Sequence, residues 1–139
     1  KFSSRAMPGY VAGTLGMIGY WHIAINKKTY LAHRLAWFYV HGVWPTHQID
    51  HINGKPADNR LCNLREATSV QNSRNMKKPV TNTSGYKGVT WDKKVELWKA
   101  FVWLHGKYKF LGHARTAEAA FIIRQAGAEK YYGEFARHE

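Results

Sequence analysis

The sequence predicts an α+β protein made of two small domains, each with antiparallel strands followed by a helix. Residues 48–76 have the pattern strand, loop, strand, helix. Residues 86–131 have alternating strand patterns that lead into a helical stripe of small and apolar residues. The chain of 139 residues, 45% apolar and 14% aromatic, has room for one medium or two small domains and enough large side chains to fill their cores.

The first predicted domain covers residues 1–76, and its first 13 residues are expected to form an extended lead-in. Apolar residues alternate with other residues before and after Asn26-Lys27, as in a hairpin, and a helical pattern ending before Gly42 follows. Three elements are therefore expected here, two paired strands and a helix that packs on them: residues 19–25, 29–32 and 33–41.

The stretch from Gln48 to Asn75 is the most informative part of the chain. A strand is predicted at 48–51, Asn53-Gly54 marks a turn, and a second strand is predicted at 63–66. Thr68 begins a capping-box pattern, so a helix is expected from there to about Met76.

A basic linker is predicted at 77–83, followed by a second domain at 84–139. Its expected strands are 86–91, 96–104 and 107–111, and its expected helix runs from Thr116 to about Tyr131. Three antiparallel strands covered by one helix form a compact domain.

Net charge and cysteine content narrow the classes of partner and location. The formal net charge is +12, and residues 77–115 hold nine Lys/Arg against only Asp92 and Glu96. Such a surplus predicts a polyanionic partner, with nucleic acid favoured over an anionic membrane surface. Cys62 is the only cysteine, which excludes an internal disulfide and a Cys-rich zinc site and fits a reducing, cytoplasmic setting.

Membrane insertion and secretion are not expected. No apolar run approaches the roughly 18 residues needed to span a bilayer, and no signal-peptide pattern is present. The chain starts at Lys1 rather than Met, as expected of a fragment or a processed chain.

The central stretch collects the groups that phosphodiester hydrolysis needs. A neutral histidine such as His51 can take a proton from water near pH 7. A carboxylate such as Asp50 and an asparagine amide can hold a hard divalent ion, which stabilises charge on the phosphate. Successive strand residues point to opposite faces, so these two side chains share a site only if the strand bends or ends there. On spacing alone, a polar loop between two elements remains the alternative.

The run from Tyr30 to Asn75 resembles the HNH endonucleases of the phage and homing type, which have a ββα-metal fold. The motifs that carry this resemblance are Ile49-Asp50-His51, Asp58-Asn59-Arg60, Asn63-Leu64 and Ser69-x-x-Asn72. Lys55-Pro56 departs from the acidic or polar residues common after the turn, and without paired cysteines the zinc-stabilised members are not the model.

The resemblance implies a role for each matching residue. His51 would be the general base, and Asp50 and Asn72 would hold one Mg²⁺ or Mn²⁺ ion per active site. Asn63 would bond across the loop and help to orient the histidine. Asn59 would support the loop. Asn75, one helical turn after Asn72, would have a structural role or replace Asn72 as metal ligand.

Residues 84–136 resemble the plant ethylene-response-factor type of DNA-binding domain, which lays a three-stranded sheet in the major groove. The resemblance rests on Gly85-Tyr86-Lys87-Gly88-Val89, Trp98-Lys99-Ala100, Leu111-Gly112 and Thr116-Ala117-Glu118-Ala119-Ala120. Positions that carry Arg in the plant proteins are Thr90, Trp103 and Tyr108 here, so the plant target sequence does not transfer. The residues predicted to contact DNA are Lys87, Lys93, Lys94, Lys99, Trp103 and Tyr108, together with Arg60 and Arg74 near the first motif.

The leading interpretation is a divalent-metal-dependent, site-specific endonuclease of double-stranded DNA in a bacterial or phage-infected cell. It would nick as a monomer and cut both strands as a dimer, and the sequence leaves the oligomeric state open. A non-catalytic DNA-binding regulator or architectural protein is the alternative, because it shares the charge and the second domain. An RNA-binding module is less favoured, since no aromatic RNP-type motif is present. The sheet face that carries Phe101, Trp103, Tyr108 and Phe110 could instead pack against the first domain. For Lys93 and Lys94, the alternative is a solvated hairpin tip. The other histidines before the motif, namely His22, His33, His41 and His47, are interpreted as surface or core residues.

Overall fold

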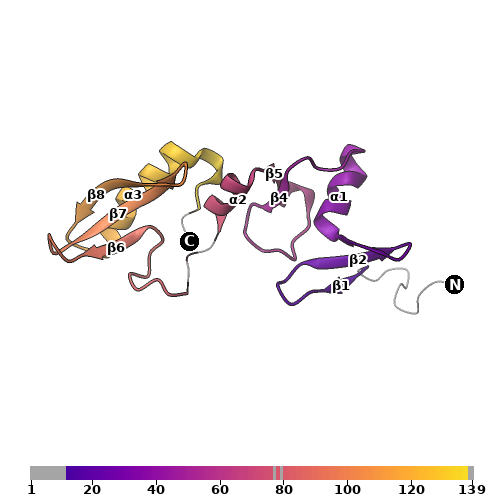
Figure 1. Ribbon diagram of the computed structural model, residues 1–139, viewed down its shortest axis with the longest axis horizontal. Coiled ribbons are helices and arrows are strands. Elements are labelled where there is room, and N and C mark those ends of the chain that lie inside the picture. Colours follow the sequence, from indigo (N-terminus) through magenta and orange to yellow (C-terminus); the bar gives the residue numbers. More distant parts are fainter. Residues whose placement is uncertain (1–11, 77, 79, 138–139) are drawn as a thin grey trace. The chain divides into compact units, whose positions relative to one another are not determined.

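The computed structural model describes residues 12–76, 78 and 80–137, as a mixed arrangement of helices and small antiparallel sheets (Figure 1). Most of the predicted lead-in and two residues of the predicted linker lie outside the described residues. Contacts within the chain divide it into two units, Lys1–Thr68 and Ser69–Glu139. The predicted domain boundary at residues 76–77 stays a prediction.

The first unit opens with a three-stranded antiparallel sheet in the order β1-β2-β3, built from Thr14–Leu15, Trp21–Ile25 and Lys28–Leu31. The turn between β2 and β3 is made by Asn26 and Lys27, both with positive φ, so the predicted hairpin is present. Helix α1, Ala32–His41, follows directly and is capped by Gly42, whose N–H bonds to Phe38 O at 2.9 Å and whose left-handed φ of 70° suits glycine.

A second, two-stranded sheet completes the first unit. Strand β4, Gln48–His51, pairs antiparallel with β5, Leu64–Ala67, and a short 3₁₀ turn, η1, Leu61–Asn63, precedes β5. β5 begins one residue later than predicted, because Asn63 ends the turn and its amide is engaged in the loop. Arg34 of α1 donates to the carbonyl oxygens of His47 and Pro45 at 3.2 and 3.1 Å, which fixes the approach to β4.

In the second unit, helix α2, Ser69–Asn75, begins within the predicted capping pattern. A three-stranded antiparallel sheet follows in the order β6-β7-β8, Val89–Asp92, Leu97–Leu104 and Lys107–Ala114. Helix α3, Ala117–Tyr132, packs on this sheet, and a short 3₁₀ turn, η2, Gly133–Phe135, ends the described elements (Figure 1). The expected sheet of three strands covered by one helix is therefore observed.

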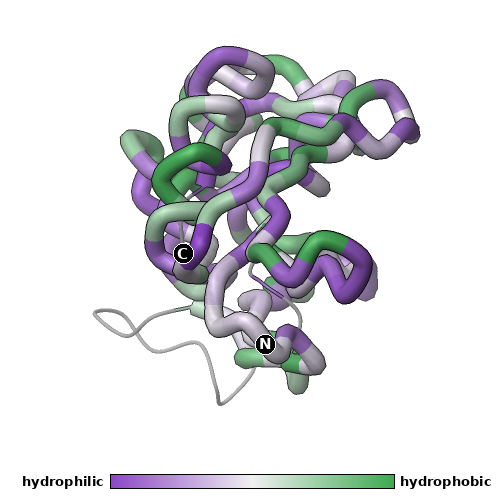
Figure 2. Tube along the Cα trace, turned by 90° about the vertical axis from the view of Figure 1, so that its left-hand side faces the viewer, coloured by the Kyte–Doolittle hydropathy of each residue, from purple (hydrophilic) through white to green (hydrophobic). Residues whose placement is uncertain are grey.

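The core of the second unit lies between α3 and one face of the sheet. Ala100 and Val102 of β7 are 0% and 2% exposed and pack with Ala120 and Ala128 of α3. The predicted cap of α3 is present, since Thr116 Oγ1 accepts from Ala119 N at 3.1 Å. Hydrophilic and hydrophobic residues alternate along the trace (Figure 2), as expected of elements buried on one face.

Strand β6 starts at Val89 rather than at the predicted Tyr86, and the preceding turn explains this correction. Ser84 Oγ bonds to the carbonyl oxygens of Tyr86 and Val89 at 2.9 and 2.8 Å, which holds residues 84–88 in turns. Gly88 has a φ of +71°, and a Cβ there would lie 2.6 Å from Phe101 O. Only glycine fits this close approach of backbone to β7.

Candidate active site

Asp50 and His51 are the last two residues of β4, and both are buried, with 3% and 4% exposure. Their neighbours differ, as expected of successive strand residues. Asp50 Oδ2 accepts from Arg65 Nε and Nη2 at 2.9 and 2.8 Å, and Arg65 is its direct cross-strand partner in β5. His51 contacts instead the loop, the His33 ring at the start of α1 and the Tyr20 ring before β2.

The imidazole of His51 is held by an amide from the β4–β5 loop. Its Nε2 lies 3.0 Å from Asn59 Oδ1. An amide oxygen can only accept a hydrogen bond, so Nε2 carries the proton and Nδ1 is the basic nitrogen of the neutral ring. Asn59 was predicted to support the loop; the structure places its side chain directly on the candidate base.

The loop between the two strands is closed by asparagine side chains. Asn63 Oδ1 accepts from Asn53 N at 2.9 Å, and Asn63 Nδ2 donates to Asp58 O at 2.8 Å. Asn53 Nδ2 in turn donates to Asp58 Oδ2 at 2.7 Å. These bonds cross the loop from both sides, so they fix the segment that carries Asn59. Sequence reasoning identified Asn63 but missed Asn53 and Asp58 as partners.

Arg60, predicted to contact DNA, is paired within the same loop. Its Nε and Nη2 donate to the two carboxylate oxygens of Asp58 at 2.8 and 2.7 Å. This hydrogen bonding holds the pKa of the Asp58 carboxyl well below its usual range. The Arg60 side chain is 74% exposed, so it faces solvent while it neutralises the loop carboxylate.

Two aromatic rings pack around His51, and the sequence alone did not indicate either contact. The His33 ring lies edge-on at a centroid distance of 5.1 Å, and the Tyr20 ring lies 5.8 Å away. His33, the second residue of α1, is 4% exposed, and its Nδ1 has no hydrogen-bond partner among the described residues. Burial, followed by the nearby charges of His51, Arg34 and His22, lowers the pKa of His33 to about 4. A neutral His33 beside the candidate base adds no competing positive charge at pH 7.

Because His33 is buried and neutral, we predict that the free energy of unfolding decreases in acid. Its pKa in the folded chain, about 4, is below the ordinary 6.5, so the unfolded chain binds the proton more readily between these values. Stability is therefore fully present above about pH 6.5 and falls as the pH drops to 4. At about 1.4 kcal/mol per pKa unit, the loss reaches about 3 kcal/mol.

Urea unfolding of the wild type and of His33→Phe at pH 7, 6, 5 and 4 measures this loss. The wild type should lose about 3 kcal/mol more than the variant over that range, since phenylalanine keeps the ring but not the titration. Parallel losses in the two proteins would show that His33 does not titrate in this way.

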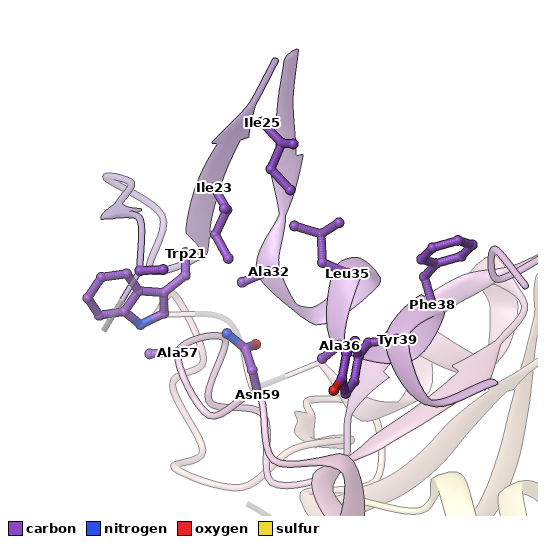
Figure 3. Close-up of a pocket in the computed structure, with 11 residues that line it drawn as sticks. Trp21, Ile23, Ile25, Ala32, Leu35, Ala36, Phe38, Tyr39, Ala57 and Asn59 are labelled. Carbon is purple, nitrogen blue, oxygen red and sulfur yellow. The ribbon is translucent and has the colours of Figure 1, made fainter. Parts of the chain in front are cut away.

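An apolar groove of about 700 Å³ lies beside this site, between β2 and α1 (Figure 3). Trp21, Ile23 and Leu35 line it, and Asn59 lies on its wall near Ala57. None of the described residues that line it carries a charge. The groups that could act on a phosphate therefore lie in the polar loop and at the end of β4.

The residues predicted to hold a metal ion fit that role in donor chemistry. A carboxylate oxygen of Asp50 and an amide oxygen of Asn72 are ligands that Mg²⁺ and Mn²⁺ accept. Among the described residues, no group of three or more His, Cys, Asp or Glu side chains gathers as a metal site, and the predicted set contains only one such side chain. Arg65 already pairs with Asp50 through two contacts on Oδ2, so an ion bound to this carboxylate would share it with a guanidinium. Asn72 and the support residue Asn75 both lie on α2, where Asn75 is buried.

The residues predicted to contact DNA fall into two groups in the second unit. Lys93 and Lys94 are exposed in the β6–β7 turn, and Trp103 and Tyr108 are 57% and 43% exposed on neighbouring strands, with their rings edge to face. The remaining three are engaged with protein groups. Lys99 pairs with Asp92 at 3.3 Å, Lys87 donates to Arg74 O at 2.7 Å, and the Arg74 guanidinium lies 4.8 Å from the centre of the Tyr132 ring.

Comparison with known proteins defines the class of this chain. Residues 30–74 match the HNH endonuclease family, and the chain thus carries an HNH endonuclease domain that includes Asp50, His51 and Asn63. Over 107 residues, covering 76% of this chain and 87% of the relative, it is 39% identical to Protein 3.8 of Escherichia phage T7. The chain belongs to the same family as that phage protein, whose name states no activity. No solved structure matches the chain significantly.

The comparisons do not support the resemblance of residues 84–136 to the plant DNA-binding domain, which stays a prediction. The ββα-metal arrangement is likewise a prediction. Within the described residues, no helix is both long and apolar enough to cross a membrane.

Proposed function

We propose that this protein is a divalent-metal-dependent endonuclease that hydrolyses phosphodiester bonds in double-stranded DNA. The observation that carries the proposal is the buried His51 at the end of β4, within the HNH-matching segment, with its Nε2 bonded to Asn59. A phage relative and a net charge of +12 support DNA as substrate and an infected bacterial cell as the setting.

In the proposed mechanism, His51 Nδ1 takes the proton from a water molecule as the water attacks phosphorus. Asn59 Oδ1 accepts from Nε2–H throughout, so it fixes the tautomer and stabilises the imidazolium that forms. A divalent ion held by Asp50 and Asn72 would stabilise the negative charge on the phosphate and on the leaving 3′ oxygen. The asparagine bonds across the loop keep Asn59 in place.

The second unit would supply much of the DNA affinity. The exposed lysines of the β6–β7 turn and the exposed aromatic residues of β7 and β8 suit contact with phosphates and bases. One active site cuts one strand, so a monomer would nick, and cutting both strands would need a dimer or a second binding event.

A DNA-binding protein without catalysis is the second candidate, and the ion pair between Asp50 and Arg65 favours it. A carboxylate that is already neutralised by a largely buried guanidinium has less need of a metal ion. The two functions are separated by incubating the protein with long linear phage DNA, which offers many sequences, in the presence of Mg²⁺. Shortened fragments would support the endonuclease, and a gel shift with intact DNA would support the binding protein.

Asn59→Ala should slow cleavage about tenfold, because it removes the hydrogen bond to His51 Nε2. Such a bond is worth about 1 kcal/mol, and somewhat more when the imidazole becomes charged. The loss should appear in kcat rather than KM, measured by single-turnover cleavage between pH 6 and 9. If Asn59 acts through His51, the double variant His51→Ala/Asn59→Ala is no slower than His51→Ala alone. Additive losses would instead give Asn59 a separate role.

A further inference from the structure

A second cavity, of about 340 Å³, lies wholly within the second unit. Three cationic side chains line it: Arg74 of α2, Lys87 of the turn before β6, and Arg124 in the middle of α3. None of the described residues that line this cavity carries a carboxylate. Its positive charge is therefore not neutralised by its own wall.

Arg124 is the most unusual of these residues, because it is 2% exposed. Its Nη1 donates to Arg137 O at 2.6 Å, and its Nε is buried without a hydrogen-bond partner among the described residues. The Nε of Arg74 is also buried without a hydrogen-bond partner among the described residues. A buried guanidinium without an anion is costly in free energy, and unsatisfied buried donors add to that cost. The cavity is thus short of an acceptor and of negative charge.

Lys87 shows the same imbalance. Its Nζ donates to the carbonyl oxygens of Arg74 and Met76, which carry no full charge. Burial, with the charges of Arg124 and Arg137 nearby, lowers the pKa of Lys87 to about 8. A cavity with low-dielectric walls concentrates this positive potential and attracts anions.

We propose that the cavity lined by Arg74, Lys87 and Arg124 binds a phosphate group. Guanidinium groups match phosphate oxygens with two parallel hydrogen bonds, and a lysine adds a point charge. Phosphate suits three cations better than a carboxylate does, because it offers more charge and more acceptor oxygens. The volume falls at the small end of ligand pockets, roughly 300–1,000 Å³. We further assign this phosphate to a DNA strand, and that assignment rests on the proposed function.

The first test uses inorganic phosphate and the full chain, without DNA or cleavage. Melting temperature is measured as phosphate replaces chloride at constant ionic strength. We expect a saturable rise in Tm for the wild type and for Lys130→Gln, which removes an exposed cation from the same helix. Arg124→Gln and Lys87→Gln should bind phosphate at least tenfold more weakly. A wild-type Tm that responds equally to phosphate and chloride, or unchanged affinity in folded variants, overturns the site.

The second test identifies the source of the phosphate. Binding of a short duplex is measured over a range of salt concentrations for the same four proteins, with far-UV circular dichroism to confirm folding. Loss of a DNA phosphate contact lowers the slope of log K against log salt by about 0.9. That change in the cavity variants, and not in Lys130→Gln, supports DNA as the ligand. Unchanged DNA binding alongside lost inorganic phosphate binding overturns the DNA assignment and leaves a site for free phosphate. If the cavity variants lose phosphate binding and show the smaller salt slope, but the wild type does not cleave DNA, the phosphate site stands and only the proposed nuclease activity fails.

Discussion

His51→Ala should lower the rate of DNA cleavage by about 10²- to 10⁴-fold, the usual contribution of a positioned general base. DNA affinity should stay nearly unchanged, because the imidazole is 4% exposed and bonds to Asn59 within the protein. Single-turnover cleavage and a gel shift on the same duplex measure the two effects separately.

His47→Ala is the matched control, since His47 is exposed and its hydrogen bonds to Arg34 and Glu66 use backbone atoms. It should cleave at the wild-type rate. A His51→Ala protein that cuts as fast as the control would remove His51 from the mechanism.

Asp50→Ala should have two large effects, one on cleavage and one on folding. Cleavage should be lost with the proposed metal ligand. The free energy of unfolding should fall by about 3–5 kcal/mol, because the guanidinium of Arg65 would stay largely buried without the Asp50 carboxylate. Urea unfolding at pH 7 measures the second effect.

The double variant Asp50→Leu/Arg65→Met separates these effects. An apolar pair of similar volume can replace a buried ion pair at little cost, so stability should return while cleavage stays absent. If the double variant cleaves DNA, Asp50 has no part in the reaction. If Asp50→Ala is as stable as the wild type, the ion pair contributes little to the fold.

The elements could be predicted wherever their signals are local. The β2–β3 hairpin follows from alternation around Asn26-Lys27, and α3 follows from Thr116 and the stripe of small residues after it. The start of β6 could not be placed in this way, because it depends on the Ser84 hydroxyl and on the fit of Gly88 against β7. Lys87 consequently lies before the strand and bonds to carbonyl groups near α2, where alternation does not apply.

The candidate site shows the same division. The resemblance to the HNH endonucleases identified Asp50, His51 and Asn63, which lie close in sequence around one loop. The partners that set their chemistry come from elsewhere in the chain. Arg65 lies opposite Asp50 only because of the strand register, and His33 meets His51 only because the folded chain brings the start of α1 to the end of β4. Such contacts depend on tertiary structure, which no short pattern records.

The central claim is that this chain hydrolyses DNA with a divalent ion, and a supercoiled plasmid tests it most directly. Wild type and His51→Ala are incubated with plasmid in Mg²⁺, in Mn²⁺ and in excess EDTA, and the products are separated by gel electrophoresis. We predict open-circular or linear DNA from the wild type with metal, and supercoiled DNA in every other lane. Products that persist in EDTA, or that His51→Ala makes as readily as the wild type, would contradict the claim.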